Sequence, residues 1–189
     1  MEFLPAMQWG WLNGWLPIAV FYLVFAILML VFPRLVVKKL YDISRWTREQ
    51  RILSLLGKPF AIACLVLITL TPLKIGHPVF PIGLSIYGLG FIGMLVALFN
   101  YRNTPPGEPV TRGLYRVSRN PQWLTLATMF AGASIAVGSG IAFLFIAIAA
   151  VFYHFRILGE ERSCQMRYGE SYLAYTQQVP RYLLDIITI

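Results

Sequence analysis

Charge is scarce in this sequence and unevenly spread. Only 13% of the 189 residues are charged, against 58% that are hydrophobic, which is far more apolar than a water-soluble domain needs. No Asp, Glu, Lys or Arg occurs in residues 3–33, 59–73, 75–101 or 120–155. Uncharged stretches of this kind are typical of helices that cross a bilayer, so a soluble globular domain is excluded.

Cysteine and histidine are equally rare, with two of each. Cys64 lies in an uncharged stretch and Cys164 in a charged one, so the two are expected at different depths and make poor disulfide partners. We expect His77 to be a solvated loop residue and His154 to contact lipid headgroups. Nothing here has metal-ligand spacing, and the sequence predicts no metal site.

The uncharged stretches predict five membrane-spanning helices. Gly138-Ser139-Gly140 divides the last stretch into two short helices, because glycine and serine in so apolar a run favour a turn. The predicted fold class is therefore all-α, a polytopic membrane protein whose last two spans form a short helical hairpin. We place the helices at residues 15–32, 60–73 (which residues 52–56 could lengthen), 79–99 and, as a pair, within 122–155.

Basic residues lie between the predicted spans. Fifteen of the 16 Lys and Arg fall in residues 34–58, 100–121 and 156–189, leaving only Lys74 on the other side of the membrane. Because Lys and Arg favour the cytoplasmic side, the N-terminus is predicted outside and the C-terminus in the cytoplasm. The net charge of +8 thus comes from basic residues that face the surface of the lipid bilayer. The bilayer is the expected partner, and no nucleic acid is expected.

The chain is predicted to form a single membrane domain over residues 1–189. Residues 1–99 would hold three spans and an interfacial basic segment at 34–58, whose interleaved apolar residues predict an amphipathic helix on an anionic leaflet. Gly88, Gly90 and Gly93 match a dinucleotide-type glycine pattern, but no strand precedes them in this apolar span. We interpret them as positions of close helix packing.

Polar residues gather in two segments that this topology brings to one cytoplasmic interface. Residues 113–123 contain Gly-Leu-Tyr-Arg and then Arg-Asn-Pro-Gln-Trp. Arg156 and Glu160 are one helical turn apart on one face, and Glu161 follows. Such charges at a membrane edge are costly to bury without partners, so a functional site is expected here. An interfacial ion pair that only fixes the last helix is the structural alternative.

The order of these motifs resembles the C-terminal half of the isoprenylcysteine carboxyl methyltransferase and phospholipid methyltransferase superfamily. The correspondence spans roughly residues 97–182 and continues through Tyr-Gly-Glu-Ser-Tyr at 168–172 and Val-Pro-Arg at 179–181. Asn120, Trp123 and Thr125 replace the family's His, Tyr and Gly. Asn120 does not titrate near neutral pH, so a mechanism that needs a protonatable imidazole there is excluded.

The resemblance implies an S-adenosylmethionine-dependent methyltransferase that acts on a lipidic acceptor. Its cofactor pocket would face the cytoplasm beneath the C-terminal segment, and the acceptor, a prenylcysteine-like carboxylate or a phospholipid amine, would enter sideways from the bilayer. The catalytic residues would be Arg156, which holds the acceptor as substrate, and Glu161, the candidate base for an amine. The implied cofactor-binding residues are Asn100, Gly107, Val110, Tyr115, Asn120, Pro121, Gln122, Trp123 and Glu160.

Two other functions stay open at this point. An NADPH-dependent sterol-type reductase is implied by a related helical scaffold, and a reductant-dependent change in a sterol-like substrate would favour it. A non-catalytic membrane subunit would use Arg156 and Glu160 for packing, and partner association without any ligand affinity would identify it.

Overall fold

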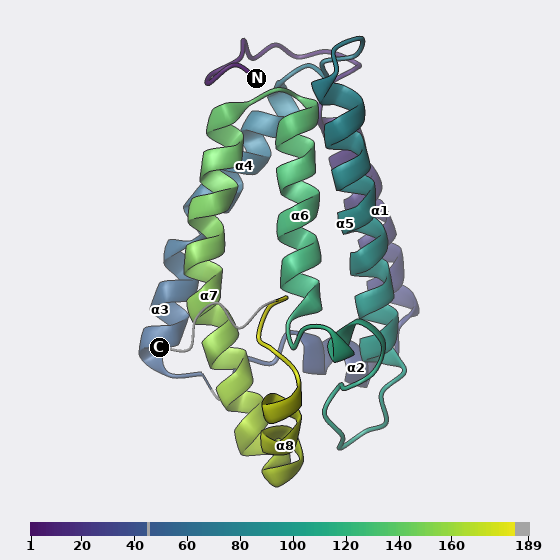
Figure 1. The fold of residues 1–189 in the computed structure, drawn as a ribbon, viewed down its shortest axis with the longest axis vertical. Coiled ribbons are helices and arrows are strands. Elements are labelled where there is room, and N and C mark those ends of the chain that lie inside the picture. Colours follow the sequence, from purple (N-terminus) through teal and green to yellow (C-terminus); the bar gives the residue numbers. More distant parts are fainter. Residues whose placement is uncertain (45, 184–189) are drawn as a thin grey trace.

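A computed structural model describes residues 1–44 and 46–183 (Figure 1). In this part of the chain no named strand occurs, and the only β-type contacts are two isolated bridges. The all-α prediction is therefore confirmed. The helices are α1 (Trp15–Val31), α2 (Arg34–Leu40), α3 (Arg48–Leu56), α4 (Lys58–Leu70), α5 (Val79–Arg102), the short 3-10 helix η1 (Gly113–Arg116), α6 (Pro121–Ala136), α7 (Gly140–Tyr168) and α8 (Glu170–Gln178).

Among residues 1–44 and 46–183, three helical stretches are long and apolar enough to cross a membrane. They are α5, α7 and the stretch Arg48–Leu70, in which α3 leads directly into α4. Helix α1 is apolar but shorter, with 17 residues, and α6 has 16 residues. A bilayer core needs about 20 residues of helix, so the exact number of spans stays a prediction.

Helices α5 and α6 pack closely because glycines line their contact. A Cβ atom added at Gly90 would lie 2.5 Å from the backbone nitrogen of Met129, and one at Gly93 would lie 2.5 Å from Thr125 Cγ2. A Cβ at Gly88 would meet nothing within 4 Å. The packing interpretation is thus confirmed for Gly90 and Gly93 and is wrong for Gly88, which faces away from α6.

The predicted turn between the last two long helices is confirmed, but the hairpin is unequal. Gly138 has a φ of +70° after α6, and the Ser139 hydroxyl accepts a hydrogen bond from the Ala142 amide to begin α7. Helix α7 then runs for 29 residues, well beyond its expected end at Phe155, and stops only before Gly169. No proline interrupts residues 156–168, so the polar site residues continue on the same helix (Figure 1).

The sequence predicted one amphipathic helix over the basic segment 34–58. This prediction is wrong, because the segment forms two helices, α2 and α3. Helix α2 ends at Leu40, and the Asp42 carboxylate then accepts a hydrogen bond from the Ser44 amide at 2.9 Å. Thr47 and Gln50 form a capping box that begins α3. Local turn and capping hydrogen bonds therefore divide the segment in two. Arg45, one of its basic residues, lies outside the described residues.

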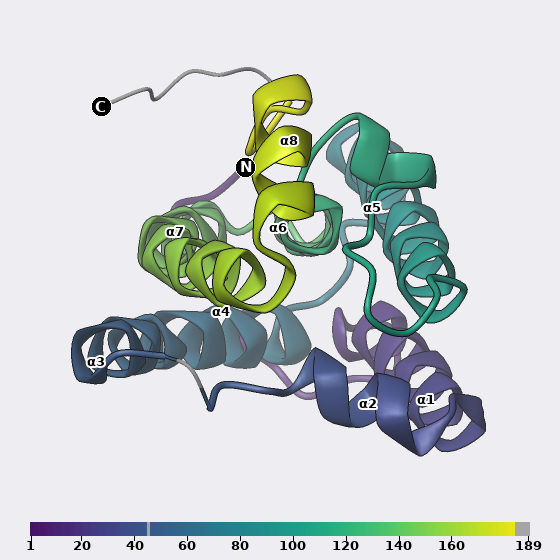
Figure 2. The same cartoon turned by 90° about the horizontal axis from the view of Figure 1, so that it is seen from below.

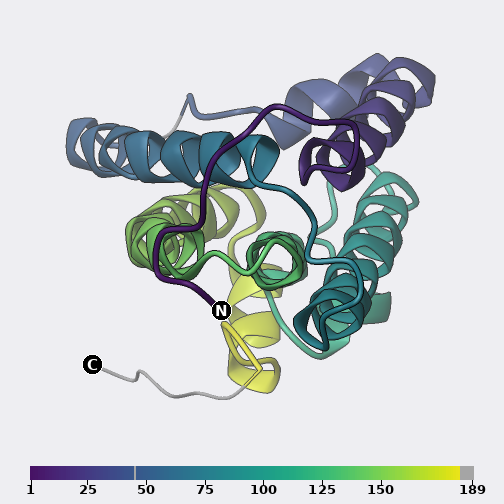
Figure 3. The ribbon, with the colours of Figure 1, turned by 90° about the horizontal axis from the view of Figure 1, so that it is seen from above.

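The two ends of the bundle differ sharply. At one end, residues 1–14 form a strap over the helix turns, with the Glu2 amide bonded to the Gly138 carbonyl and the Gln8 amide to the Leu70 carbonyl, both at 2.9 Å (Figure 3). Lys74 lies at this end and pairs with Glu2. At the opposite end, α2, α7, α8 and the segment after α5 surround the start of α6 (Figure 2). The two polar segments thus converge at one end.

Candidate active site

A polar cavity opens where α2, α6, α7 and α8 meet, at the end of the bundle away from the N-terminal strap. It encloses about 900 Å³, including its open mouth. Glu161 lies in its wall, as do six of the nine residues that we expected to bind a cofactor. These six are Val110, Tyr115, Asn120, Gln122, Trp123 and Glu160.

Glu160 is held at the inner side of this cavity by two donors. The Trp123 indole donates to one carboxylate oxygen and the Arg156 Nε to the other, each at 3.0 Å. The Trp123 ring in turn stacks on Tyr153, with ring centres 4.9 Å apart. Helices α6 and α7 therefore fix the position of the Glu160 carboxylate. Asp42 and Glu161 are the other acidic side chains that line the cavity in the described part of the chain.

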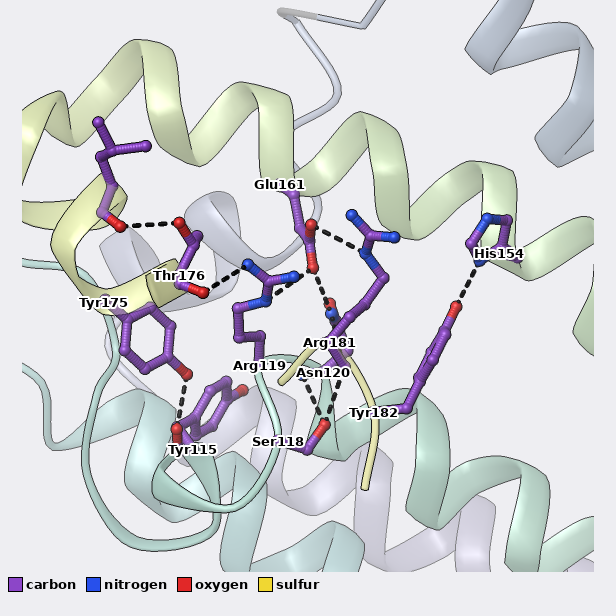
Figure 4. A network of polar contacts seen from close by, with 11 residues as sticks. Tyr115, Ser118, Arg119, Asn120, His154, Glu161, Tyr175, Thr176, Arg181 and Tyr182 are labelled. Carbon is purple, nitrogen blue, oxygen red and sulfur yellow. Dashed lines mark hydrogen bonds and ion pairs between the residues drawn. The ribbon is translucent and has the colours of Figure 1, made fainter. Parts of the chain in front are cut away.

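The C-terminal segment is fastened to the start of α6 through Glu161 (Figure 4). One Glu161 oxygen accepts a hydrogen bond from Asn120 Nδ2 at 2.9 Å, and the other accepts one from Arg181 Nε at 3.0 Å. Arg119 adds an ion pair at 3.4 Å, and the Ser118 hydroxyl donates to the Arg181 carbonyl at 3.0 Å. The segment after α8 is thus tied to the start of α6, and α8 itself lines one side of the cavity with Tyr172 and Tyr175. Helix α8 and the segment after it together form the roof of the cavity.

Tyrosines join α8 to η1 beneath this roof. The Tyr175 hydroxyl donates to the Tyr115 carbonyl at 2.6 Å (Figure 4). Tyr115 is only 7% exposed, and burial raises the pKa of its phenol well above the ordinary value. The Tyr115 ring is therefore a neutral, fixed part of the cavity wall.

Three buried donors of the cavity wall have no hydrogen-bond partner among residues 1–44 and 46–183, and one of them, Arg119 Nε, has its ion pair with Glu161. The other two are Gln122 Nε2 and Trp46 Nε1. A buried donor left unsatisfied costs about 1–3 kcal/mol, so a ligand with oxygen or nitrogen acceptors would stabilise this wall. Together with Glu160 and the aromatic rings, these donors suit a ligand that has a flat ring, acceptor atoms and positive charge.

Four of the predicted site residues do not line the polar cavity. Asn100 packs beneath η1, so close that a Cβ on Gly113 would lie 2.1 Å from its amide nitrogen. Gly107 is exposed, with a φ of +86° and nothing near the position of a Cβ atom. Pro121 is the buried first residue of α6. Arg156 lines a second cavity instead.

This second cavity is apolar and lies among α1, α4, α5 and α6. It encloses about 1170 Å³, including its open mouth, and its walls are mostly aromatic and aliphatic. Gln122 and Trp123 line both cavities. Arg156 stands at the junction, with its guanidinium carbon 4.7 Å from the centre of the Trp123 ring. The Trp123 wall thus separates a polar cavity from an apolar one.

Sequence reasoning missed the wall that Lys39, Asp42 and Trp46 provide. Asp42 pairs with Arg167 of α7 at 2.5 Å. Hydrogen bonds from Ser44, and then the Arg167 guanidinium, hold the pKa of Asp42 at about 2. These residues had been assigned to a lipid-facing surface. An isolated aspartate among so many basic residues was the signal available in the sequence.

The comparisons with known proteins give one match, which is to the sequence pattern of a family. The chain matches no curated protein and no solved structure. The pattern of the phospholipid methyltransferase family matches residues 59–171, a stretch that contains η1, α5, α6 and α7 but not α1, α2 or α3. Because that match covers more than half of the chain and includes the Trp123 wall with Arg156 and Glu160, the chain belongs to the phospholipid methyltransferase family, whose membership implies methyltransferase activity.

Proposed function

We propose that the protein transfers a methyl group from S-adenosylmethionine to a lipidic acceptor. The observation that carries this proposal is the junction at Trp123, where a polar cavity open at the bundle end adjoins an apolar cavity among the helices. A water-soluble donor and a bilayer-dissolved acceptor have to meet at such a junction. When bound, the cofactor supplies an electrophilic methyl group on a positively charged sulfur.

The residues of the polar cavity fit this cofactor in three respects. The Glu160 carboxylate offsets positive charge on the sulfonium and ammonium groups. The rings of Tyr115 and Trp123 provide flat surfaces for adenine. Gln122 Nε2 and Trp46 Nε1 are buried donors that the ligand's oxygen and nitrogen atoms would satisfy.

Methyl transfer asks the protein chiefly for alignment and exclusion of water. We assign Glu160 to the cofactor and Arg156 to the acceptor, since they lie on opposite sides of the Trp123 wall and are joined at 3.0 Å. Glu161, which bonds Asn120 and Arg181, positions the roof. A role for Glu161 as general base applies only if the acceptor is an amine.

We further propose that the polar cavity faces the cytoplasm and that the N-terminus lies outside. The distribution of fifteen of the 16 basic residues supports this orientation. Single cysteines introduced as His77→Cys and Glu108→Cys, with Cys64 and Cys164 replaced by serine, test it in intact cells. An impermeant thiol reagent is expected to label His77→Cys alone, and labelling of Glu108→Cys alone would reverse the topology.

Direct binding of S-adenosylmethionine to the purified protein tests the cofactor assignment. Glu160→Gln should weaken binding by about tenfold or more, since a hydrogen bond to a charged group contributes about 1.5–3 kcal/mol. Glu170→Gln, at the exposed start of α8, removes a carboxylate away from the cavity and serves as the matched control. Unchanged binding by Glu160→Gln would remove that residue from the site.

Product analysis separates the competing functions. The protein is incubated in lipid with methyl-labelled cofactor and a total lipid extract, and a labelled lipid is expected. A change in a sterol-like lipid that requires NADPH, without methyl transfer, would identify a reductase. No ligand affinity, together with partner binding that depends on Arg156 and Glu160, would identify a non-catalytic subunit.

A further inference from the structure

The charged side chains that line the apolar cavity are all positive in the described part of the chain. Lys58 and Arg156 line this cavity, and no Asp or Glu does so in the described part of the chain. The remaining polar groups there are the side chains of Tyr22, Tyr41, Gln122, Trp123 and Tyr153. Glu160, which compensates one positive charge, lies in the wall of the other cavity. A group that enters from the apolar side therefore meets net positive charge.

Arg156 is held so that the two terminal nitrogens of its guanidinium group, its fork, remain available to a ligand. Its Nε donates to Glu160, whereas its terminal nitrogens make no hydrogen bond to any other described residue. The guanidinium carbon lies 4.7 Å from the centre of the Trp123 ring and 5.0 Å from that of Trp46. Contact with two indoles restricts the planar guanidinium and leaves its terminal donors to pair with an anion.

Trp46 owes its place to contacts outside the matched family region. It lies in the connection between α2 and α3, yet only 6% of its surface is exposed. Its amide bonds the Ile43 carbonyl at 3.2 Å, and the same connection is tied to α7 by the Asp42–Arg167 pair. Trp46 is therefore suited to fix the Arg156 side chain against Trp123.

We propose that Lys58 joins Arg156 in a head site that binds an anionic oxygen group of the acceptor, and that Trp46 is the positioning residue for Arg156. The inference rests on the proposed function and specifies its acceptor. A carboxylate or a lipid phosphate gains paired hydrogen bonds from the Arg156 fork. A head group that carries only a protonated amine is repelled by both cations and has no carboxylate in this cavity to receive it.

Four lipids with one common chain test the charge preference by ligand-induced shifts in Tm of the detergent-solubilised protein. They are hexadecanoate, hexadecyl phosphate, hexadecylamine and hexadecanol. At about pH 8.5 the carboxylate is negative and the amine positive. The two anions should raise Tm more than hexadecanol does, and the amine less. The larger shift of the two anions identifies carboxylate or phosphate as the preferred group.

Variants assign the effect to the head site. Arg156→Gln should abolish the preference for anions, and Lys58→Gln should reduce it. Trp46→Leu should weaken hexadecanoate binding by about five- to tenfold, and Trp46→Phe should restore part of the loss because a ring face remains. Lys38→Gln changes an exposed lysine of α2 that lines neither cavity and should bind as the wild type does.

The inference is overturned if the amine stabilises the protein as well as the anions do, or if Arg156→Gln keeps the anion preference. It also fails for Trp46 if Trp46→Phe binds no better than Trp46→Leu. Binding of S-adenosylmethionine, measured on the same samples, reports separately on the proposed function. If the wild type binds S-adenosylmethionine but shows no preference for anions, the head site alone is rejected. If the wild type prefers anions but does not bind S-adenosylmethionine, the proposed methyl donor alone is rejected.

Discussion

The side-chain amide of Asn120 donates to Glu161 at 2.9 Å, although the two residues are 41 positions apart in the chain. This bond joins the start of α6 to the last third of α7 and, through Arg181, to the roof of the polar cavity. Asn120 occupies the position at which the family resemblance places a histidine. An amide keeps its donor at every pH, so the link does not depend on a titrating group.

Replacing Asn120 with aspartate should open the roof. Asn120→Asp places a second carboxylate against Glu161, and like charges in a partly buried site repel each other. We expect Tm to fall and cofactor binding to weaken by about tenfold or more, as is usual when a buried polar network is broken. Asn120→His retains an N–H donor and should bind far better than Asn120→Asp. Equal binding by wild type and Asn120→Asp would contradict the role given to the roof.

The contact between Tyr175 and Tyr115 can be tested without loss of an aromatic ring. Tyr175→Phe removes the hydroxyl that bonds the Tyr115 carbonyl and should cost about 1 kcal/mol of unfolding free energy. Tyr172→Phe is the matched control, because the Tyr172 hydroxyl makes no hydrogen bond within residues 1–44 and 46–183. Thermal unfolding in detergent measures both variants. An equal decrease in Tm for the two variants would show that the Tyr175 hydrogen bond does not contribute to stability as predicted.

Glycine packing between α5 and α6 predicts opposite effects at neighbouring positions. Gly90→Ala would bring a Cβ atom to 2.5 Å from the Met129 backbone, whereas Gly88→Ala meets open space. Overpacking of this kind costs about 1–3 kcal/mol, while alanine in an open helix position is favoured by about 1 kcal/mol over glycine. Gly90→Ala should therefore unfold at a lower temperature than the wild type. The prediction fails if Gly88→Ala is the more damaging change.

The pairing of Asp42 with Arg167 should be insensitive to pH over the physiological range. A folded-state pKa of about 2, below the ordinary 3.8, gives stability that is present above pH 3.8 and lost as the pH falls through about 2. Asp42→Asn should weaken cofactor binding by about two- to fivefold, as is usual for an exposed pair. That ratio should be constant between about pH 5 and pH 9. A ratio that changes within this window would point to a different titrating group.

The sequence predicted the helices well wherever uncharged runs set their limits. The first predicted helix begins at Trp15 as α1 does, and the third begins at Val79 as α5 does. The break after Leu40 was missed, because it depends on the Asp42 turn and the Thr47 capping box rather than on apolar periodicity. The extension of α7 beyond Phe155 was missed because the sequence analysis placed the end of the helix at the end of the uncharged run.

The candidate site was predictable in part. Motif order brought Tyr115, Asn120, Trp123 and Glu160 together, and they do line one cavity. The participation of Trp46 was hidden, because it arises from folding of the connection before α3 across α7, a tertiary contact that local pattern does not encode. Likewise, the position of Asn100 beneath η1 follows from its contact with Gly113. Spacing along the chain does not determine which residues of a loop face a cavity.

The strap of residues 1–14 has a consequence for biogenesis. The Glu2 amide donates to the Gly138 carbonyl, and the Gly140 amide donates to the Glu2 carbonyl, so the strap has partners that are synthesised long after it. This end of the bundle cannot be completed until α7 has been inserted.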